Sequence, residues 1–334
     1  MRYKDAGVDI DKAEVFKKEV KKLVRKTSNK SVLSDIGNFG GLYSQGKGSI
    51  LTSTIDGVGT KTIVASMMNQ HENIGYDVVS HGANDLVVQG AKPLFCLDYI
   101  GTSKLDNRIA VQLIKGMVKA CRETGCVLIG GETAQMPGVY NEGQYDLVGC
   151  VVGVVSRKNL VDGSRIKPGD VVVGLASTGL HTNGYTLARR ALLSHFGVND
   201  YLKELKTTVG KALLMPHRNY SKIILPLLKR VKIKGIAHIT GGGLIDNIPR
   251  VLPDGVRVVL DQGRWQVLPI FRLIQKEGKV PAGEMYRTFN MGIGMVLIMD
   301  EKNADKIKGG KIIGRVEACA GKPHTCVINQ YGEE

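Results

Sequence analysis

The sequence SILTSTIDGVGTK (Ser49–Lys61) contains a strand-like segment, a glycine-rich turn and the approach to a helix, in that order. The β-like residues predict a strand over Ser49–Ile55, and a helix is predicted at Ile63–Met68. Asp56 lies where the strand ends, and the two glycines after it let the backbone turn closely. The backbone N–H groups freed by such a turn can face an anion, and Lys61 adds positive charge. This stretch therefore predicts a strand–turn–helix unit with a site for a negatively charged group.

The same alternation of strands and helices extends through the first half of the chain. Further strands are predicted at Leu94–Ile100, Val127–Ile129 and Leu147–Val155. Further helices are predicted at Tyr76–Val88 and Asp106–Thr124. The second of these helices has Asp106 as its N-cap and Gly125 directly after its end.

A turn-rich polar stretch, Val161–Val173, separates this half from the second. We place a domain boundary there, which gives domains at residues 1–165 and 166–334. The predicted strands of the second half are Val171–Leu175, Gly235–Ile239, Arg257–Asp261, Ile293–Met299 and Lys311–Val316. The predicted helices are Tyr185–His195, a region broken near Pro216 that runs to about Leu228, Leu244–Arg250 and Leu268–Lys276. The fold class is α/β (α+β).

Composition excludes several classes of protein. The chain has 334 residues, is 43% hydrophobic and has no collagen-like repeat among its 42 glycines, so it is a folded chain. The longest apolar run, Leu147–Val155, is far shorter than the ~20 residues that span a bilayer. The charged N-terminus, MRYKDAGVDI, does not resemble a signal peptide. We therefore expect a cytoplasmic protein.

The cysteines and histidines do not form sequence motifs for metal binding. The six cysteines include no C-x-x-C pair, and buried reduced thiols are favoured over disulfides or a zinc site. The seven histidines include no H-E-x-x-H pair, so no structural metal is predicted.

The chain carries a net charge of +15. Basic residues are frequent in Leu202–Lys234 and in an amphipathic helix predicted within Lys12–Lys30, whose apolar residues include Phe16 and Leu23. A solvated surface is the favoured interpretation, and binding of nucleic acid or attraction of small phosphorylated anions are alternatives. Nucleic acid is not an expected partner, because aromatic residues are not interleaved with the basic ones.

One apparent nucleotide motif is rejected. Gly41–Lys47 (GLYSQGK) fits the pattern G-x-x-x-x-G-K. However, Gly48 follows where a P-loop has Ser or Thr, and the segment leads into a strand rather than a helix.

Acidic residues at strand ends and on one helix suit a hard cation. Asp56 ends one strand, Glu132 follows two glycines after another, and Asn84 and Asp85 lie among apolar residues of a helix. Mg²⁺ prefers oxygen ligands and usually bridges to substrate phosphates through a few carboxylates. Each residue alone is more often a cap or a solvated turn, but together they suggest Mg²⁺ with a phosphorylated ligand.

Two glycine-rich sites follow in the second half. Ser177–Gly184 (STGLHTNG) includes His181, which could contact a ligand, act as an acid or base, or be a buried structural histidine. Thr240–Gly243 (TGGG) precedes a helix and is either a phosphate-binding turn or a tight strand–helix connection.

Eight segments, in this order, resemble the phosphoribosylformylglycinamidine cyclo-ligase (aminoimidazole ribonucleotide synthetase) family. They are YKDAGVDI (Tyr3–Ile10), DGVGTK (Asp56–Lys61), NDLVVQGA (Asn84–Ala91), GGETAQMPG (Gly130–Gly138), HTNGY (His181–Tyr185), HITGGG (His238–Gly243), NIPRVLP (Asn247–Pro253) and MYRTFNMGIGM (Met285–Met295). The resemblance extends from about Tyr3 to Val316. Within it, Asn38 stands where the family is expected to have glycine, and His217 where it often has threonine.

The resemblance implies two α/β domains. The N-terminal domain would form a dimeric β-sheet or barrel with its partner, and the C-terminal domain would pack a mixed sheet against helices. It also implies ATP-dependent ring closure of formylglycinamidine ribonucleotide by a homodimer that uses Mg²⁺. Related enzymes fit less well: selenophosphate synthetase has an early reactive Cys or selenocysteine, whereas the first cysteine here is Cys96. Formylglycinamidine ribonucleotide synthetase is much longer, and thiamine-monophosphate kinase lacks the MYRTFNMGIGM segment.

The resemblance also assigns roles by motif. The metal-binding residues would be Asp56, Asn84, Asp85 and Glu132, and the nucleotide-binding residues Lys4, Asp5, Asp9 and Lys61. The substrate-binding residues would be Asn183, Gly241, Gly242 and Gly243, and the catalytic residues His181 and Asp85.

Overall fold

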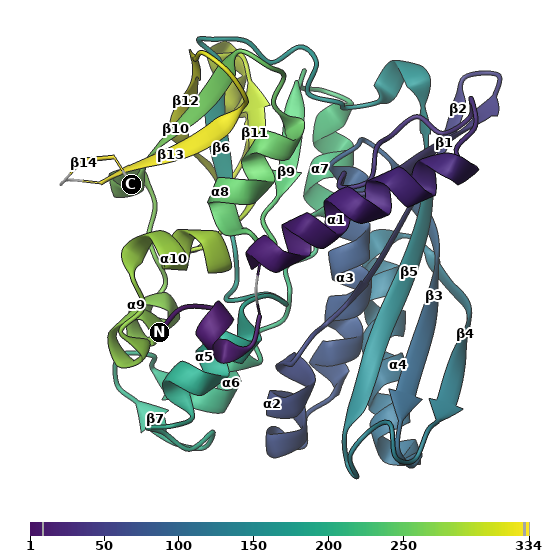
Figure 1. The fold of residues 1–334 in the computed structure, drawn as a ribbon, viewed down its shortest axis with the longest axis vertical. Helices are drawn as coiled ribbons and strands as arrows, with labels where there is room; N and C mark the ends of the chain where they lie inside the picture. The colour runs from purple at the N-terminus through teal and green to yellow at the C-terminus, as the bar shows by residue number, and fades with distance from the viewer. Residues whose placement is uncertain (9, 330–331, 334) are drawn as a thin grey trace.

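Two β-sheets organise the chain, one in each half (Figure 1). The computed structural model describes residues 1–8, 10–329 and 332–333. The first sheet has the strand order β1-β2-β5-β3-β4. Its strands are β1 (Gly41–Gly46), β2 (Ser49–Gly57), β3 (Lys92–Thr102), β4 (Val127–Gln135) and β5 (Tyr145–Ser156). Only β3 and β4 pair in parallel within this sheet.

Two helices of the first domain, α3 (Glu72–Val87) and α4 (Asn107–Thr124), pack on one face of that sheet, and α2 (Lys61–Met68) contacts α3 and the α6 helix (Val209–Leu213) of the second domain. The α3 helix contacts β2, β3 and β5, and it is buried over most of its length. It therefore lies between the first sheet and the second domain (Figure 1).

The second sheet is mixed, as the resemblance implies. Its order is β14-β13-β10-β12-β6-β11-β9, with β10 and β13 parallel and the other pairs antiparallel. The strands are β6 (Val171–Ala176), β9 (Gly235–His238), β10 (Val256–Asp261), β11 (Ile293–Met299), β12 (Gly310–Ala318), β13 (His324–Asn329) and β14 (Gly332–Glu333). The helices are α5 (Tyr185–Leu192), α6 (Val209–Leu213), α7 (Ser221–Leu228), α8 (Gly243–Asn247), α9 (Pro269–Gly278) and α10 (Ala282–Thr288).

Most predicted elements are present, and the differences have local causes. The β4 strand continues through the glycines to Gln135, because backbone pairing with β3 extends it beyond the apolar residues. The predicted helical region broken near Pro216 consists of α6 and α7, and the short hairpin β7 (Tyr201–Leu202) and β8 (Thr207–Thr208) precedes it. The β1, β13 and α10 elements were not predicted. Gly41–Lys47 forms a hairpin with β2, which confirms the rejection of a P-loop.

The N-terminal segment joins the two domains. Its helix α1 (Ile10–Val24) leaves the predicted apolar residues Phe16 and Leu23 exposed, so this face is not buried within the chain. Residues 1–8 instead pack on the second domain, where the Met1 ammonium donates to the carbonyl of Gly278. Among the described residues, no helix is both long and apolar enough to cross a membrane. Of the six cysteines, Cys96, Cys121 and Cys126 are buried, as predicted, whereas Cys150, Cys319 and Cys326 are only half-buried.

The closest approach between α3 and α4 depends on two glycines. A Cβ at Gly75 would lie 1.9 Å from the carbonyl oxygen of Leu113, and a Cβ at Gly116 would lie 1.8 Å from that of Glu72. Any side chain at either position would push the helices apart, and α3 carries the polar residues described below.

We therefore expect Gly116→Ala to lower the free energy of unfolding by about 2 kcal/mol, because overpacking outweighs the roughly 1 kcal/mol gain in helix propensity. Urea denaturation followed by circular dichroism measures this change. The matched control is Gly283→Ala in α10, where an added Cβ meets no atom within 4 Å. Equal stability changes in the two variants would contradict the predicted packing constraint.

Candidate functional site

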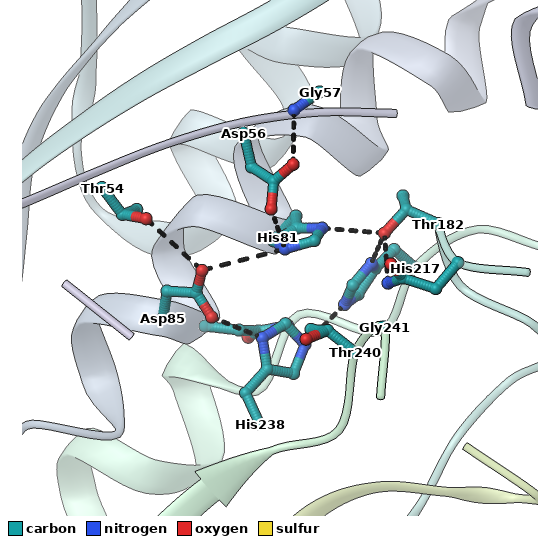
Figure 2. A network of polar contacts seen from close by, with 12 residues as sticks. Thr54, Asp56, Gly57, His81, Asp85, Thr182, His217, His238, Thr240 and Gly241 are labelled. Atoms are coloured by element: carbon teal, nitrogen blue, oxygen red, sulfur yellow. Dashed lines mark hydrogen bonds and ion pairs between the residues drawn. The ribbon is translucent and has the colours of Figure 1, made fainter. Parts of the chain in front are cut away.

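A buried polar network fills the place where the two domains meet (Figure 2). Four imidazoles lie there, and all are buried: His81, His181, His217 and His238. They come from α3, from the loop before α5, from the loop before α7 and from the end of β9. Residues distant in sequence thus form one site.

The periodicity of α3 explains the first domain's contribution. Asp77, His81, Asn84 and Asp85 follow the spacing i, i+4, i+7 and i+8, which places them on one face of the helix. The remaining faces of α3 pack against the sheet and α4. The polar stripe on α3 is the sequence signal for this site. Of its residues, Asn84 and Asp85 are the ones predicted to belong to the site.

His81 connects the end of β2 to the second domain. Its Nε2 lies 3.0 Å from Oδ2 of Asp56 and 3.8 Å from Oδ2 of Asp85. Its Nδ1 lies 2.7 Å from the hydroxyl of Thr182. Burial alone would lower the pKa of His81, but the two carboxylates outweigh burial and raise it to about 9.

A second pair of imidazoles continues the network. Nδ1 of His217 lies 3.4 Å from the Thr182 hydroxyl, and Nε2 of His217 lies 3.0 Å from Nε2 of His238. Nδ1 of His238 lies 2.8 Å from Oδ1 of Asp85. Burial, together with the neighbouring basic groups, holds the pKa of His217 well below its usual value. Burial also lowers the pKa of His238, although Asp85 opposes the shift.

Lys61 is predicted to face phosphates, but its side chain points into the protein interior and is fully buried. Its ammonium lies 2.5 Å from Oδ2 of Asp77 and donates to the carbonyl oxygens of His181 (3.0 Å) and Met215 (2.7 Å). Each of its three protons thus has a protein acceptor. Burial lowers the pKa of Lys61 despite the attraction of Asp77.

The structure brings some of the predicted metal-binding residues together and separates others. Asp56 and Asp85 flank His81. The amide of Asn84 is used within the protein, donating to the carbonyl of Arg218 and accepting from the backbone N–H of Tyr220, both at 2.9 Å. Glu132 is exposed on β4, with β3 and β5 between it and β2.

The predicted substrate-binding loops lie side by side. A Cβ at Gly241 would be 3.2 Å from Oδ1 of Asn183, so the two loops face each other closely. Gly242 and Gly243 have positive φ angles of 99° and 57°, and Asn247 donates to the carbonyl oxygens of Gly241 and Gly243. Glycine is thus required for the shape of this turn.

His181 is enclosed rather than open to solvent. Its Nε2 accepts from the backbone N–H groups of Thr178 (3.3 Å) and Arg218 (3.5 Å), and its ring stacks on His217. Its Nδ1 has no hydrogen-bond partner among the described residues. Burial holds the pKa of His181 well below its usual value.

The N-terminal residues predicted to bind nucleotide lie on the surface. Lys4 and Asp5 are exposed in a short 3₁₀ turn, and Asp5 accepts from the backbone N–H of Arg2. Asp9 lies outside the described residues.

Four residues of the site are not among the residues predicted from the sequence: Asp77, His81, Thr182 and His238. His217 stands in the sequence only as a departure from the family. Thr182 and His238 lie within family motifs, but nothing local indicates that these residues meet. His81, Asp85 and His238 offer ligand atoms within 4.8 Å of one another, so they could hold a metal ion.

Comparisons with solved structures support the fold. AaThiL, solved in complex with AMPPCP and TMP, superposes with a TM-score of 0.66 at 16% identity, covering 92% of this chain and 91% of that one. The hydrogenase maturation protein HypE of E. coli superposes with a TM-score of 0.62 at 16% identity, covering 85% and 84%. At these identities the likeness concerns the fold alone.

Sequence comparisons establish the family. The model described as AIR synthase related protein, N-terminal domain, matches residues 37–155, and its C-terminal counterpart matches residues 167–320. The phosphoribosylformylglycinamidine cyclo-ligase of Citrifermentans bemidjiense is 49% identical over 96% of both chains. That of Geotalea daltonii is 51% identical over 91% of this chain and 89% of its own length. The resemblance drawn from the motifs is confirmed, and the chain belongs to the phosphoribosylformylglycinamidine cyclo-ligase family.

Proposed function

We propose that this chain converts formylglycinamidine ribonucleotide and ATP to 5-aminoimidazole ribonucleotide, ADP and phosphate, as an enzyme of purine biosynthesis. The observation that supports this function is sequence similarity over nearly the whole chain. One cyclo-ligase is 49% identical over 96% of both chains. We place the reaction in the cytoplasm, since its phosphorylated substrates do not cross membranes unaided.

The chemistry has two steps. The formyl oxygen first attacks the γ-phosphorus of ATP, ADP leaves, and loss of the formamide N–H proton gives an iminophosphate. The ribosyl-bearing amidine nitrogen then attacks the formyl carbon, which closes the ring, and the oxygen leaves as phosphate after the nitrogen loses its proton. Phosphorylation is needed because an amide oxygen is a poor leaving group.

The donor set at the end of β2 fits a divalent cation bound with ATP. Asp56 is half-exposed, and the carboxylates of Asp56 and Asp85 lie 3.0 Å and 3.8 Å from the same nitrogen of His81. We propose that these two carboxylates hold Mg²⁺, which would neutralise charge on the transferring phosphoryl group. Burial would raise the pKa of Asp56, but His81 outweighs it and lowers that pKa, so the carboxylate is ionised.

The other residues divide into direct and supporting roles. We propose that Asn183 and Gly241–Gly243 bind the ribonucleotide, since these loops face each other across the domain junction. Asp85 remains the proposed catalytic group nearest the cation, whereas enclosed His181 would act by positioning its loop. Lys61 and Asn84 would support the site, because their polar groups are already bonded within the protein.

For the residues set apart from this cluster, the proposals are those implied by the family motifs. The segment with Lys4, Asp5 and Asp9 would bind the nucleotide. Glu132 would bind the cation from the open face of the first sheet, where a second chain could bring its own Asp56 and Asp85 near it.

We also propose a homodimer through the open face of the first sheet. Ile55 and Leu97 are both paired with Cys150 across adjacent strands, and they are 70% and 38% exposed. Val127 and Ile129 on β4 extend this apolar face. The β5 strand is apolar on both faces, although α3 covers only one, and a broad exposed apolar patch is typical of a protein interface.

The direct test of the function is ADP release by purified protein supplied with Mg-ATP, with and without formylglycinamidine ribonucleotide, together with detection of the aminoimidazole product. Substrate-dependent ADP matched by product would establish the reaction. ADP release without aminoimidazole would indicate another acceptor and contradict the proposal.

For Asp56→Asn, we expect kcat/KM to fall by roughly 10²-fold or more with the fold intact, because the lost contact acts mainly in the transition state. Steady-state kinetics measures the fall. Asp261→Asn is the matched control, since Asp261 also ends a strand and accepts a backbone N–H from its own turn. Unchanged kinetics in Asp56→Asn would remove this residue from the site.

For Leu97→Asp, we expect the dimer Kd to rise by about a hundredfold, because burying an unpaired carboxylate costs roughly 3 kcal/mol. Sedimentation over a range of protein concentrations reports the Kd. Tyr201→Asp places the same charge on an exposed site of the second domain and should leave association unchanged. A wild-type chain that stays monomeric would refute the proposed homodimer.

A further inference from the structure

Two imidazoles and two carboxylates lie together where the domains meet, and a metal ion bound there would replace the proton that the carboxylates hold on His81 (Figure 2). We name Asp56, His81, Asp85 and His238 the imidazole–carboxylate cluster. Nε2 of His81 is 3.0 Å from Oδ2 of Asp56 and 3.8 Å from Oδ2 of Asp85, and Nδ1 of His238 is 2.8 Å from Oδ1 of Asp85. Ligand atoms of His81, Asp85 and His238 all lie within 4.8 Å of one another, and two ligands about 2.1 Å from one ion are at most ~4.2 Å apart, so small side-chain shifts suffice for these three residues.

The far side of each imidazole in the cluster already has a partner. Nδ1 of His81 faces the Thr182 hydroxyl at 2.7 Å, and Nε2 of His238 faces Nε2 of His217 at 3.0 Å. Metal-bound histidines almost always donate their second ring N–H to an acceptor, which sets the tautomer and the ring orientation, and the Thr182 hydroxyl and the His217 nitrogen can each accept here. The orienting groups of a metal site are therefore in place.

A neighbouring trio of histidines is a weaker candidate. His181, His217 and His238 also offer nitrogens within 4.8 Å of one another. However, the His181 and His217 rings are stacked, with planes 20° apart and centroids 4.1 Å apart. An ion lies in the plane of each imidazole that binds it, so two nearly parallel stacked rings cannot both direct a lone pair at the same ion.

The donor chemistry indicates which metal this site prefers. Mg²⁺ favours oxygen ligands in an octahedron, whereas imidazole nitrogen suits zinc, iron, nickel and copper, and carboxylates also accommodate manganese. The half-exposed side chain of Asp56 leaves the site open on one side. We propose that the imidazole–carboxylate cluster binds one first-row transition-metal dication, with ligands from both domains, more tightly than it binds Mg²⁺.

The proposal rests on the proposed function in that it shares Asp56 and Asp85 with the proposed Mg²⁺ site. The test below measures metal binding without turnover. Loss of metal binding is therefore distinguishable from loss of cyclo-ligase activity.

Co²⁺ is the probe, titrated into the full, tag-free chain while visible absorption is recorded. We expect one Co²⁺ per chain with ligand-field bands of a protein-bound ion, and competition should give a Kd for Mg²⁺ at least tenfold higher. His81→Gln and His238→Gln should each weaken Co²⁺ binding by tenfold or more. His195→Gln is the control, because His195 is exposed and remote from the cluster.

His217→Thr tests the site without removing a ligand. It should weaken Co²⁺ binding by roughly 10- to 100-fold, the usual effect of losing an orienting partner, while circular dichroism confirms that the fold is retained. Wild-type protein that leaves the spectrum of aqueous Co²⁺ unchanged would overturn the proposal. Equal Co²⁺ affinity in folded His81→Gln and His195→Gln would also overturn it.

Discussion

The ammonium of Lys61 is buried between the two domains, and the arrangement of the site depends on how it is held. An isolated buried charge would cost many kcal/mol, so its protons must all find acceptors. Asp77 of α3 supplies one, and the carbonyl oxygens of His181 and Met215 supply the others. One side chain therefore attaches two loops of the second domain to the first.

Further contacts follow from this attachment. The backbone N–H of His217 donates to the second oxygen of Asp77, which positions the His217 ring against His238. Asn84 holds the next residues of the same loop through Arg218 and Tyr220. Buried polar groups on α3 are stable only because the second domain completes their hydrogen bonds, so neither domain contains the site alone.

Local patterns predicted the elements well where one force dominated. Apolar runs located the central strands, and Asp106 caps α4 as expected, accepting from the backbone N–H of Arg108. Prediction failed where tertiary contacts decided the outcome. The β4 strand runs through Gly130 and Gly131 because β3 pairs with it, and the apolar residues of α1 remain exposed because no described part of the chain covers them.

Local sequence is enough to predict the strand–helix alternation, the family motifs and the available residue chemistry, since these depend on near neighbours and on residue type. It predicts Asp56 and Asp85 as metal-binding residues and Lys61 as a phosphate-facing residue. The packing of the two domains, by contrast, directs Lys61 inward and brings His238 to Asp85, 153 positions earlier in the chain. A contact between distant residues depends on how two domains pack, and local propensity carries no information about that packing.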